Sequence, residues 1–275
     1  AAQTAKQVIL QRLREAEREV VLVEFEDKIN TVLNAIVTRV EGRMVRVEIN
    51  RAQGILPPSE QIQGEHYHPG QRLKVYLKDV ERGFKGAQLV VSRGCPEFVE
   101  ELFKNEVPEM EGGAVEIKGL SREAGVRSKI AVSSTLQGVD PVGTFVGGHG
   151  TRVQAVMSEI GEQEKIDIIV WSDDVVKYIT NALSPTKVVS VTVQEERKKA
   201  KVVVEEDQLS IAIGRGGQNV RLASKLTGYD IDVVSSKPEQ SVKQDTVVGA
   251  ANAPKLKRKT DLESSLLEAI DNVKD

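Results

Sequence analysis

Cysteine and aromatic residues are scarce in this 275-residue sequence: there is one cysteine, and Phe, Trp and Tyr together make up 4%. The single Cys95 excludes an internal disulfide and fits a reducing cytoplasm. With one tryptophan in the chain, the hydrophobic cores must be built mostly from Val, Ile, Leu and Ala. We therefore expect a cytoplasmic protein with small aliphatic cores.

Long hydrophobic runs are also missing. The longest, residues 20–23 and 166–171 (the latter interrupted by Asp167), have the length of a strand and fall well short of the ~20 residues that span a membrane. The chain opens on a charged helical pattern rather than on a secretory signal. The sequence therefore predicts no membrane partner.

A large excess of positive charge is absent, because 38 basic residues stand against 41 acidic ones and the formal net charge is -3. This balance excludes a protein coated in positive charge. It does not exclude nucleic-acid binding, which depends on where the basic residues gather.

Metal ligands are few and scattered. His66 and His68 bracket Tyr67 without a cysteine or a third ligand nearby, and His149 lies far along the chain. An exposed loop explains the histidine pair better than a metal site does. We therefore predict neither a metal nor another cofactor.

Candidate catalytic groups are equally isolated. Cys95 has no histidine beside it that could act as its base. Asp167 and Asp232 alternate with isoleucines, and we expect both to face solvent because only one face of such a sheet is buried. The sequence therefore predicts no catalytic residues and a protein that is not an enzyme.

Residues 1–24 are predicted to form an N-terminal helical segment, since Ile9, Leu10, Leu13 and Ala16 recur at helical spacing. Short β patterns separated by turn residues follow, and strands are expected at residues 21–25, 32–40, 44–49, 54–56, 73–80 and 88–92. So many short strands in so few residues predict a small β-barrel of the OB type over residues 25–95.

The last part of this barrel region is locally basic. Its basic residues are expected to form a phosphate-facing surface, and they are Arg72, Lys74, Lys78, Arg82, Lys85 and Arg93.

From residue 96 the pattern changes to alternating helices and strands, in the order helix, strand, strand, helix, loop, helix, strand. The order occurs in residues 96–171 and again in 172–236. A shift of 67 positions superposes Asp140 on Asp207 and Gly147 on Gly214, so the two units form an internal repeat. Residues 237–275 are rich in Lys, Gln, Ser and Pro, which predicts a flexible tail.

Each repeat carries a Gly-x-x-Gly loop between two helices. Glycine lets the chain turn sharply and lets another backbone come close, and the free amides at the start of the second helix attract phosphate. A P-loop is a poor alternative, because neither loop has its Lys-Ser/Thr pair and both lie between helices. We predict that nucleic acid is bound by Gly147, Gly148, His149, Gly150, Thr151, Arg152, Gly214, Arg215, Gly216, Gly217, Gln218, Arg221 and Lys225.

The two loops are not equivalent in charge. Arg215 lies in the middle of the second loop, and Arg221 and Lys225 follow it without an acidic residue as far as Leu226. In the first loop only Arg152 follows closely. We therefore expect the second loop to anchor the ligand and the first to extend its track.

Glycine loops between helices in this order resemble KH domains of the bacterial type (type II), whose loop clamps about four nucleotides of single-stranded RNA. With a barrel in front, residues 25–234 resemble the NusA family of bacterial transcription factors. The resemblance rests on Gly54-Ile55-Leu56-Pro57-Pro58, Lys129-Ile130-Ala131-Val132, Asp140-Pro141-Val142-Gly143, Arg152-Val153-Gln154-Ala155-Val156, Lys165-Ile166-Asp167-Ile168-Ile169 and Gly214-Arg215-Gly216-Gly217-Gln218-Asn219-Val220-Arg221-Leu222-Ala223.

This resemblance implies an α+β multidomain protein in which a barrel of the ribosomal S-one type precedes two tandem KH domains that form one RNA platform. It implies a non-catalytic factor that acts on RNA polymerase in pausing, termination and antitermination. The implied partners are the single-stranded nascent transcript, RNA polymerase and other Nus factors, with the protein itself a monomer. Residues 1–24 resemble the end of the family's polymerase-binding domain.

A second interpretation is an RNA-binding accessory module of RNA processing or decay, because KH domains and S-one-type barrels also accompany phosphorolytic ribonucleases. In those enzymes the KH domain usually precedes the barrel and lies beside a large catalytic core. This chain has the opposite order and no length for such a core.

Overall fold

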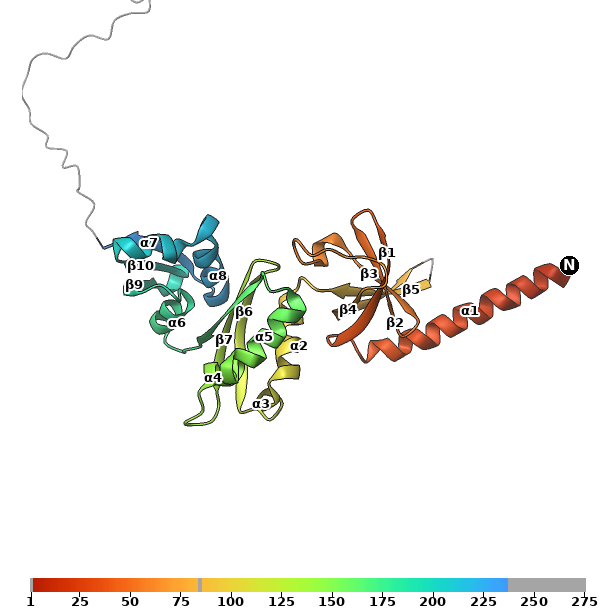
Figure 1. Cartoon of the computed structure of the whole chain (residues 1–275), viewed down its shortest axis with the longest axis horizontal. Coiled ribbons are helices and arrows are strands. Elements are labelled where there is room, and N and C mark those ends of the chain that lie inside the picture. Colours follow the sequence, from red (N-terminus) through yellow and green to blue (C-terminus); the bar gives the residue numbers. More distant parts are fainter. Residues whose placement is uncertain (1, 84–85, 237–275) are drawn as a thin grey trace, which may run out of the picture. The chain divides into compact units, whose positions relative to one another are not determined.

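The computed structural model describes residues 2–83 and 86–236 (Figure 1). Lys85 of the predicted basic surface and the predicted tail, residues 237–275, lie outside the described residues. No helix in the described part of the chain is long and apolar enough to cross a membrane.

The first domain is a closed five-stranded barrel with the strand order β1-β2-β3-β5-β4, which confirms the expected barrel. Strands β3 and β5 pair in parallel, and β4 pairs antiparallel with both β1 and β5. A short 3-10 turn, Pro58–Glu60, follows β3. The strands are β1 (Val32–Glu41), β2 (Met44–Ile49), β3 (Ala52–Leu56), β4 (Arg72–Gly83) and β5 (Gly86–Ser92).

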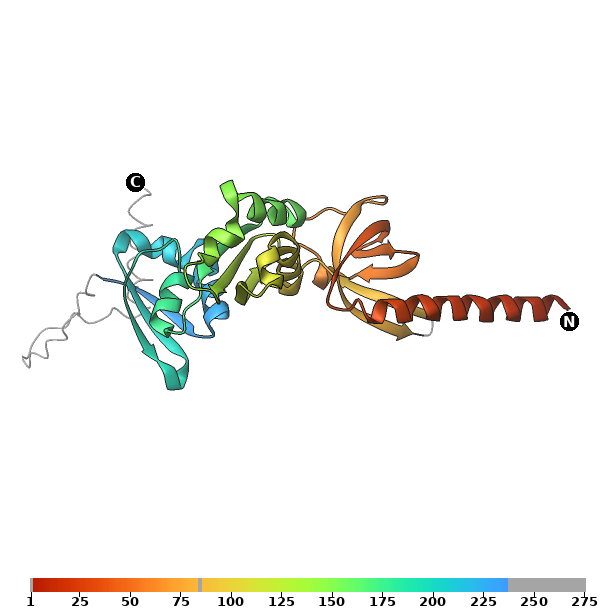
Figure 2. The ribbon, with the colours of Figure 1, turned by 90° about the horizontal axis from the view of Figure 1, so that it is seen from below.

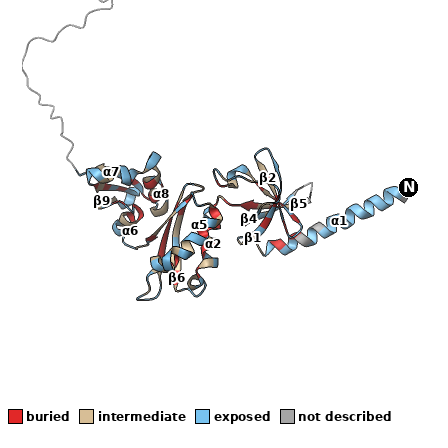
Figure 3. Ribbon diagram, in the orientation of Figure 1, coloured by how far each residue is buried: buried red, intermediate tan, exposed pale blue. Residues whose placement is uncertain are grey.

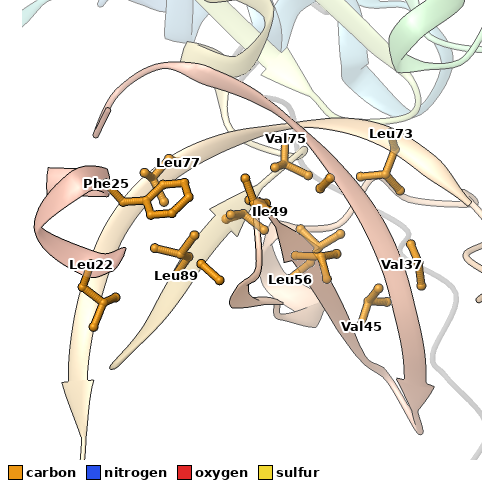
Figure 4. Packing of buried hydrophobic residues seen from close by; sticks show 14 residues of the cluster. Leu22, Phe25, Val37, Val45, Ile49, Leu56, Leu73, Val75, Leu77 and Leu89 are labelled. Carbon is orange, nitrogen blue, oxygen red and sulfur yellow. The ribbon is translucent and has the colours of Figure 1, made fainter. Parts of the chain in front are cut away.

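Among the described residues, the buried side chains of the barrel core are aliphatic, as the composition predicts, except for Phe25 of the N-terminal helix. Helix α1 runs over Ala2–Glu26, so the strand expected at residues 21–25 is wrong. Leu22 and Phe25 lie three residues apart on one helix face, are 5% and 0% exposed, and point into the barrel (Figure 4). Their burial against the barrel outweighs the β preference of the Val-Val-Leu-Val run.

The first α/β repeat contains a three-stranded sheet in the order β6-β7-β8. Helices α2, α4 and α5 pack against its strands (Figures 1 and 2). Its elements are α2 (Pro96–Glu106), α3 (Pro108–Glu111), β6 (Val115–Glu123), β7 (Arg127–Ser134), α4 (Pro141–Val146), η2 (Gly148–Gly150), α5 (Thr151–Ile160) and β8 (Lys165–Val170).

The second repeat has the same plan. Its sheet has the order β11-β10-β9, and its central strand pairs antiparallel with β9 and in parallel with β11, as β7 does with β6 and β8. The elements are α6 (Val175–Ala182), β9 (Val188–Gln194), η3 (Glu195–Arg197), β10 (Lys199–Val204), α7 (Glu206–Ile213), η4 (Arg215–Gly217), α8 (Gln218–Thr227) and β11 (Asp230–Ser235).

The sheet of the first repeat is buried on both faces. Ile130 and Val132 on β7 pack into the core of their own repeat, whereas Ala131 between them packs into the core of the second repeat. Ile169 on β8 does the same as Ala131. Neighbouring side chains of a strand point to opposite faces. One face of this sheet therefore belongs to the core of the first repeat and the other to the core of the second, so the sheet is a wall shared by both repeats (Figure 3 shows the burial).

This shared wall corrects the expectation that Asp167 faces solvent. Its carboxylate accepts two hydrogen bonds from Arg127, at 2.8 and 2.9 Å, and one from the buried Lys129 Nζ at 3.2 Å. Lys129 also donates to the carbonyl of Ser184 in the second repeat, at 3.0 Å. Burial lowers the pKa of Lys129. Asp232 is exposed.

The junction between the barrel and the first repeat is built on two arginines. Arg122 forms a two-bond ion pair with Glu164 at 2.8 and 3.0 Å, and neither side chain is exposed to solvent. Nη1 of Arg122 also donates to the carbonyls of Arg93 and Cys95, both at 2.8 Å. Buried charge is tolerated only with partners of this kind, so the junction is fixed in one geometry.

Arg93 is the second of these arginines, and its predicted place on a phosphate-facing surface is wrong. The residue is 2% exposed. Its guanidinium binds the Glu65 carboxylate at 2.6 and 2.8 Å and the carbonyl of Glu159 at 2.8 Å. Glu65 belongs to the barrel region and Glu159 to α5, so Arg93 joins the two domains.

The role of α1 in the barrel core can be tested with Phe25→Ala. We expect a loss of about 3–5 kcal/mol in barrel stability, the usual cost of removing a buried ring. Native-state hydrogen exchange of the β1 and β4 amides measures it. The control is Val20→Ala on the same helix, where the side chain is 72% exposed and the change should stay within about 0.5 kcal/mol. Equal effects of the two variants would contradict the assigned packing.

Candidate nucleic-acid interface

The two glycine loops have the same backbone conformation. The first glycines, Gly147 and Gly214, have φ/ψ of 77/167° and 75/170°. The last glycines, Gly150 and Gly217, have 77/14° and 74/14°. The structure thus places both predicted motifs as matching turns, each leading into the N-terminus of a helix, α5 or α8.

The third position of the motif separates the loops chemically. His149 and Gly216 both have positive φ, 55° and 60°. Glycine adopts this region freely, whereas another residue is strained there by about 1–2 kcal/mol. The first loop therefore carries backbone strain at His149, whereas the second loop avoids this strain because it has Gly216 at the same position.

The first glycine of each motif is needed for close packing as well as for its φ. A Cβ on Gly147 would lie 2.8 Å from Cγ of Arg152, and one on Gly214 would lie 2.8 Å from both Cβ and N of Asn219. Real Cβ atoms do not come so close to their neighbours. The helix after each loop therefore packs directly on the loop backbone.

Arg152 and Asn219 occupy equivalent positions and hold the end of the preceding helix. Arg152 Nη1 donates to the carbonyl of Thr144 at 2.7 Å, and Asn219 Nδ2 donates to that of Ala212 at 3.0 Å. Arg152 also pairs with Glu109, and this hydrogen bond lowers the pKa of the Glu109 carboxyl. Arg152 is thus bound within the first repeat, and its contact with RNA stays a prediction.

The middle residues of both loops face outward. Gly148, His149, Arg215 and Gly216 are exposed, as is Thr151 at the start of α5. Within residues 2–83 and 86–236, the amides of these four loop residues have no hydrogen-bond acceptor. Unpaired amides at a helix N-terminus are suited to a phosphate oxygen.

Cationic side chains are more abundant at the second loop. Arg215 and Lys225 are both exposed. Arg221 is also partly exposed, but its Nε and Nη2 bind the two carboxylate oxygens of Glu123 at 2.5 and 3.0 Å. Gln218 Nε2 donates to the same carboxylate at 3.1 Å.

Glu123 is a neighbour of the second loop that sequence reasoning missed. It belongs to β6 of the first repeat, 98 residues before Arg221. The absence of acidic residues between Gly214 and Leu226 indicated that the second loop is the better electrostatic site for phosphate, and no local signal pointed to a carboxylate from another domain. Hydrogen bonds from Arg221 and Gln218 lower the pKa of the Glu123 carboxyl.

Several of the basic residues on the barrel's predicted surface form ion pairs, and their contact with nucleic acid stays a prediction. Of its predicted basic residues, Lys78 pairs with Glu60, Arg82 pairs with Glu26, and Arg72 is exposed. Among its described aromatic residues, Phe25 and Tyr76 are buried and Tyr67 is half-buried with its hydroxyl bonded to Glu65. The described barrel residues therefore include no exposed Phe, Tyr or Trp ring, and their exposed aromatic rings are the imidazoles of His66 and His68.

Metal and nucleophile chemistry finds little support in the described residues. They contain no group of three or more His, Cys, Asp and Glu side chains arranged to hold a metal ion. Cys95 is buried, and this burial raises the pKa of its thiol, which disfavours a reactive thiolate.

The close packing of the motif glycines gives a direct test. Gly147→Ala and Gly214→Ala should each destabilise their repeat by more than about 1 kcal/mol, since both the Cβ and the positive φ are unfavourable. Thermal unfolding measures the effect. The control is Gly148→Ala, where a Cβ meets open space and φ is ordinary. A control as damaging as the other two would show that the packing does not matter.

Comparison with known protein families agrees with this architecture. Residues 26–92 match the model described as "S1 RNA binding domain". Residues 93–171 match "NusA-like first KH domain", and residues 175–241 match "NusA-like second KH domain". The three matches cover the barrel and both repeats in the order that the sequence predicts.

Curated relatives named transcription termination/antitermination protein NusA match most of the chain. The Thermus thermophilus protein is 54% identical over 84% of this chain and 60% of its own length, and the Bacillus subtilis protein is 50% identical over 86% and 63%. The Mycobacterium tuberculosis H37Rv protein is 44% identical over 86% of this chain and 71% of its own. The chain thus spans about three-fifths of the first two relatives. It belongs to the NusA family of transcription termination/antitermination proteins.

Proposed function

We propose that this chain is the RNA-binding part of a non-catalytic transcription elongation factor that acts on RNA polymerase in pausing, termination and antitermination. Its ligand is the single-stranded nascent transcript. The observation that supports this most is the pair of matching loops, whose exposed amides lie at helix N-termini within two NusA-like KH domains. The names of the relatives support the assignment to transcription termination and antitermination.

Each domain is proposed to have its own part in RNA binding. We propose residues 25–95, 96–171 and 172–236 as the barrel and the two KH domains of one RNA platform, preceded by the helical segment 1–24. Because the sheet of the first KH domain is part of the core of the second, the two loops are carried by one packed unit. We propose that one RNA strand contacts both loops.

We also propose the partners and the oligomeric state of the chain. A factor of this kind contacts RNA polymerase and other Nus factors in the cytoplasm, and the chain itself acts as a monomer. The relatives' names support the polymerase assignment, because termination and antitermination are events of the transcribing enzyme.

The second loop is proposed as the anchor for the RNA backbone. Arg215 projects from the middle of that loop and Lys225 from the following helix, and both are exposed. The equivalent loop of the first KH domain has Gly148 in the place of Arg215, and its nearest arginine is paired with Glu109. The first loop therefore contributes mainly backbone amides for RNA phosphates, and its glycines let the RNA backbone come close.

A reciprocal exchange at equivalent positions tests this proposal. Arg215→Gly should weaken binding of a short single-stranded RNA about tenfold and reduce the salt slope by about 0.7, the loss of one phosphate contact. Gly148→Arg, which gives the first loop the charge of the second, should strengthen binding and steepen the slope. Fluorescence anisotropy across a salt series measures both.

The matched control is Lys104→Gln on α2, which removes a positive charge that already pairs with Glu101 and belongs to neither loop. It should change affinity less than twofold, because this charge is already balanced by its carboxylate partner. Unchanged affinity and slope in Arg215→Gly would show that the second loop does not hold the RNA. Metal-dependent cleavage of RNA by the purified chain would contradict the non-catalytic assignment.

A further inference from the structure

Arg221 has a basic side chain at the second loop, yet its guanidinium hydrogen bonds are made to other groups of the chain. Nε and Nη2 hold Glu123 of the first KH domain, and Nη1 donates to the carbonyl of Gly216 at 3.0 Å. Gly216 is the loop residue with φ of 60°. One guanidinium therefore joins the first KH domain to the middle of the second domain's loop.

Glu123 lies on a hairpin that is fixed from its other side. Its neighbour Arg122 forms the fully buried ion pair with Glu164, and the amide of Gly125 donates to the same carboxylate at 2.7 Å. A Cβ on Gly125 would lie 2.2 Å from the carbonyl oxygen of Gln63, so the hairpin tip also touches the barrel region. Successive residues of a strand point to opposite faces, so Arg122 anchors the strand and Glu123 is presented to the second domain.

Helix α8 is docked along this same strand. Ser121 Oγ donates to the carbonyl of Leu222 at 2.8 Å, and both residues are buried. At Gly119 an added Cβ would lie 3.1 Å from Leu226 Cδ1 and 3.2 Å from Tyr178 Oη, so there is little space between β6 and the second domain. The Glu123–Arg221 contact is thus the loop end of a continuous interface rather than an isolated surface pair.

We propose that Glu123 is a positioning residue for RNA binding by the second KH domain. It holds Arg221 on the Gly216 carbonyl and so fixes the middle of the loop before RNA arrives. Arg221 itself does not bind phosphate, and the loop's cationic contacts are those of Arg215 and Lys225. This inference rests on the proposed function of the loop as an RNA-backbone site.

The opposite role would be a brake, in which the Glu123 carboxylate competes with phosphate for Arg221. Because the arginine lowers the pKa of this carboxyl, the pair is ionic at neutral pH, and both roles are electrostatically possible. They differ in sign. Removal of a positioning residue weakens RNA binding, whereas removal of a brake strengthens it.

The experiment measures affinity and salt slope for a short single-stranded RNA with the full chain. Glu123→Ala should weaken binding about fivefold, the order expected for loss of a charge-assisted hydrogen bond that orders the site. Glu123→Gln retains an acceptor for Arg221 and should stay within about twofold of the parent. Glu116→Ala is the matched control, because Glu116 lies on the same strand and pairs on the surface with Lys118; it should have no effect.

Arg221→Met gives the second measurement and keeps the aliphatic stem on α8. Positioning predicts a loss like that of Glu123→Ala, an unchanged salt slope, and no further loss in the double variant, because both residues act through one contact. A salt slope reduced by about 0.7 would instead make Arg221 a phosphate ligand and overturn the proposal.

Arg215→Gly separates failure of this proposal from failure of the proposed function. Tighter binding by Glu123→Ala overturns positioning in favour of a brake. Unchanged binding by Glu123→Ala, together with weaker binding by Arg215→Gly, overturns positioning and leaves the loop as the RNA site. If Arg215→Gly also binds as the parent does, the loop itself is not the site, and both proposals fall.

Discussion

The buried ion pair of Arg122 and Glu164 is the constraint on which the arrangement of the domains depends. Two charges without contact to solvent are tolerated only when nearly every donor and acceptor is used. Glu164 accepts hydrogen bonds from Arg122, from Ser128 Oγ and from the Gly125 amide. Arg122 also donates to the carbonyls of Arg93 and Cys95, at the end of the barrel region. Moving the hairpin would therefore break several of these bonds at once.

The same hairpin presents Glu123 to the second KH domain, so one fixed element has contacts with three parts of the chain. Ala131 and Ile169 extend this coupling through the hydrophobic core, since they belong to the first sheet and pack in the second domain. The two copies of the repeat are consequently not interchangeable. The first copy contributes its sheet to the core of the second and presents Glu123 to the second loop. The second copy carries the loop that this contact fixes.

Local patterns were sufficient for much of this fold. The glycine loops, the repeat offset and the strands of the barrel could be predicted because they depend on turn chemistry and on spacing within one element. The end of α1 could not be predicted, because Leu22 and Phe25 adopt a helix only as a result of packing against the barrel. Arg93 and Asp167 were misjudged for one reason. The partner of each lies far away in sequence, and whether an arginine or an aspartate faces water depends on that partner.

A structure of the chain with a short single-stranded RNA is the most direct test of the central claim. Our account predicts an RNA phosphate at the amides of the second loop with Arg215 beside it, while Arg221 remains on Glu123 and the Gly216 carbonyl. A phosphate bound by Arg221, with Glu123 released, would contradict the claim that the first KH domain fixes the RNA loop of the second.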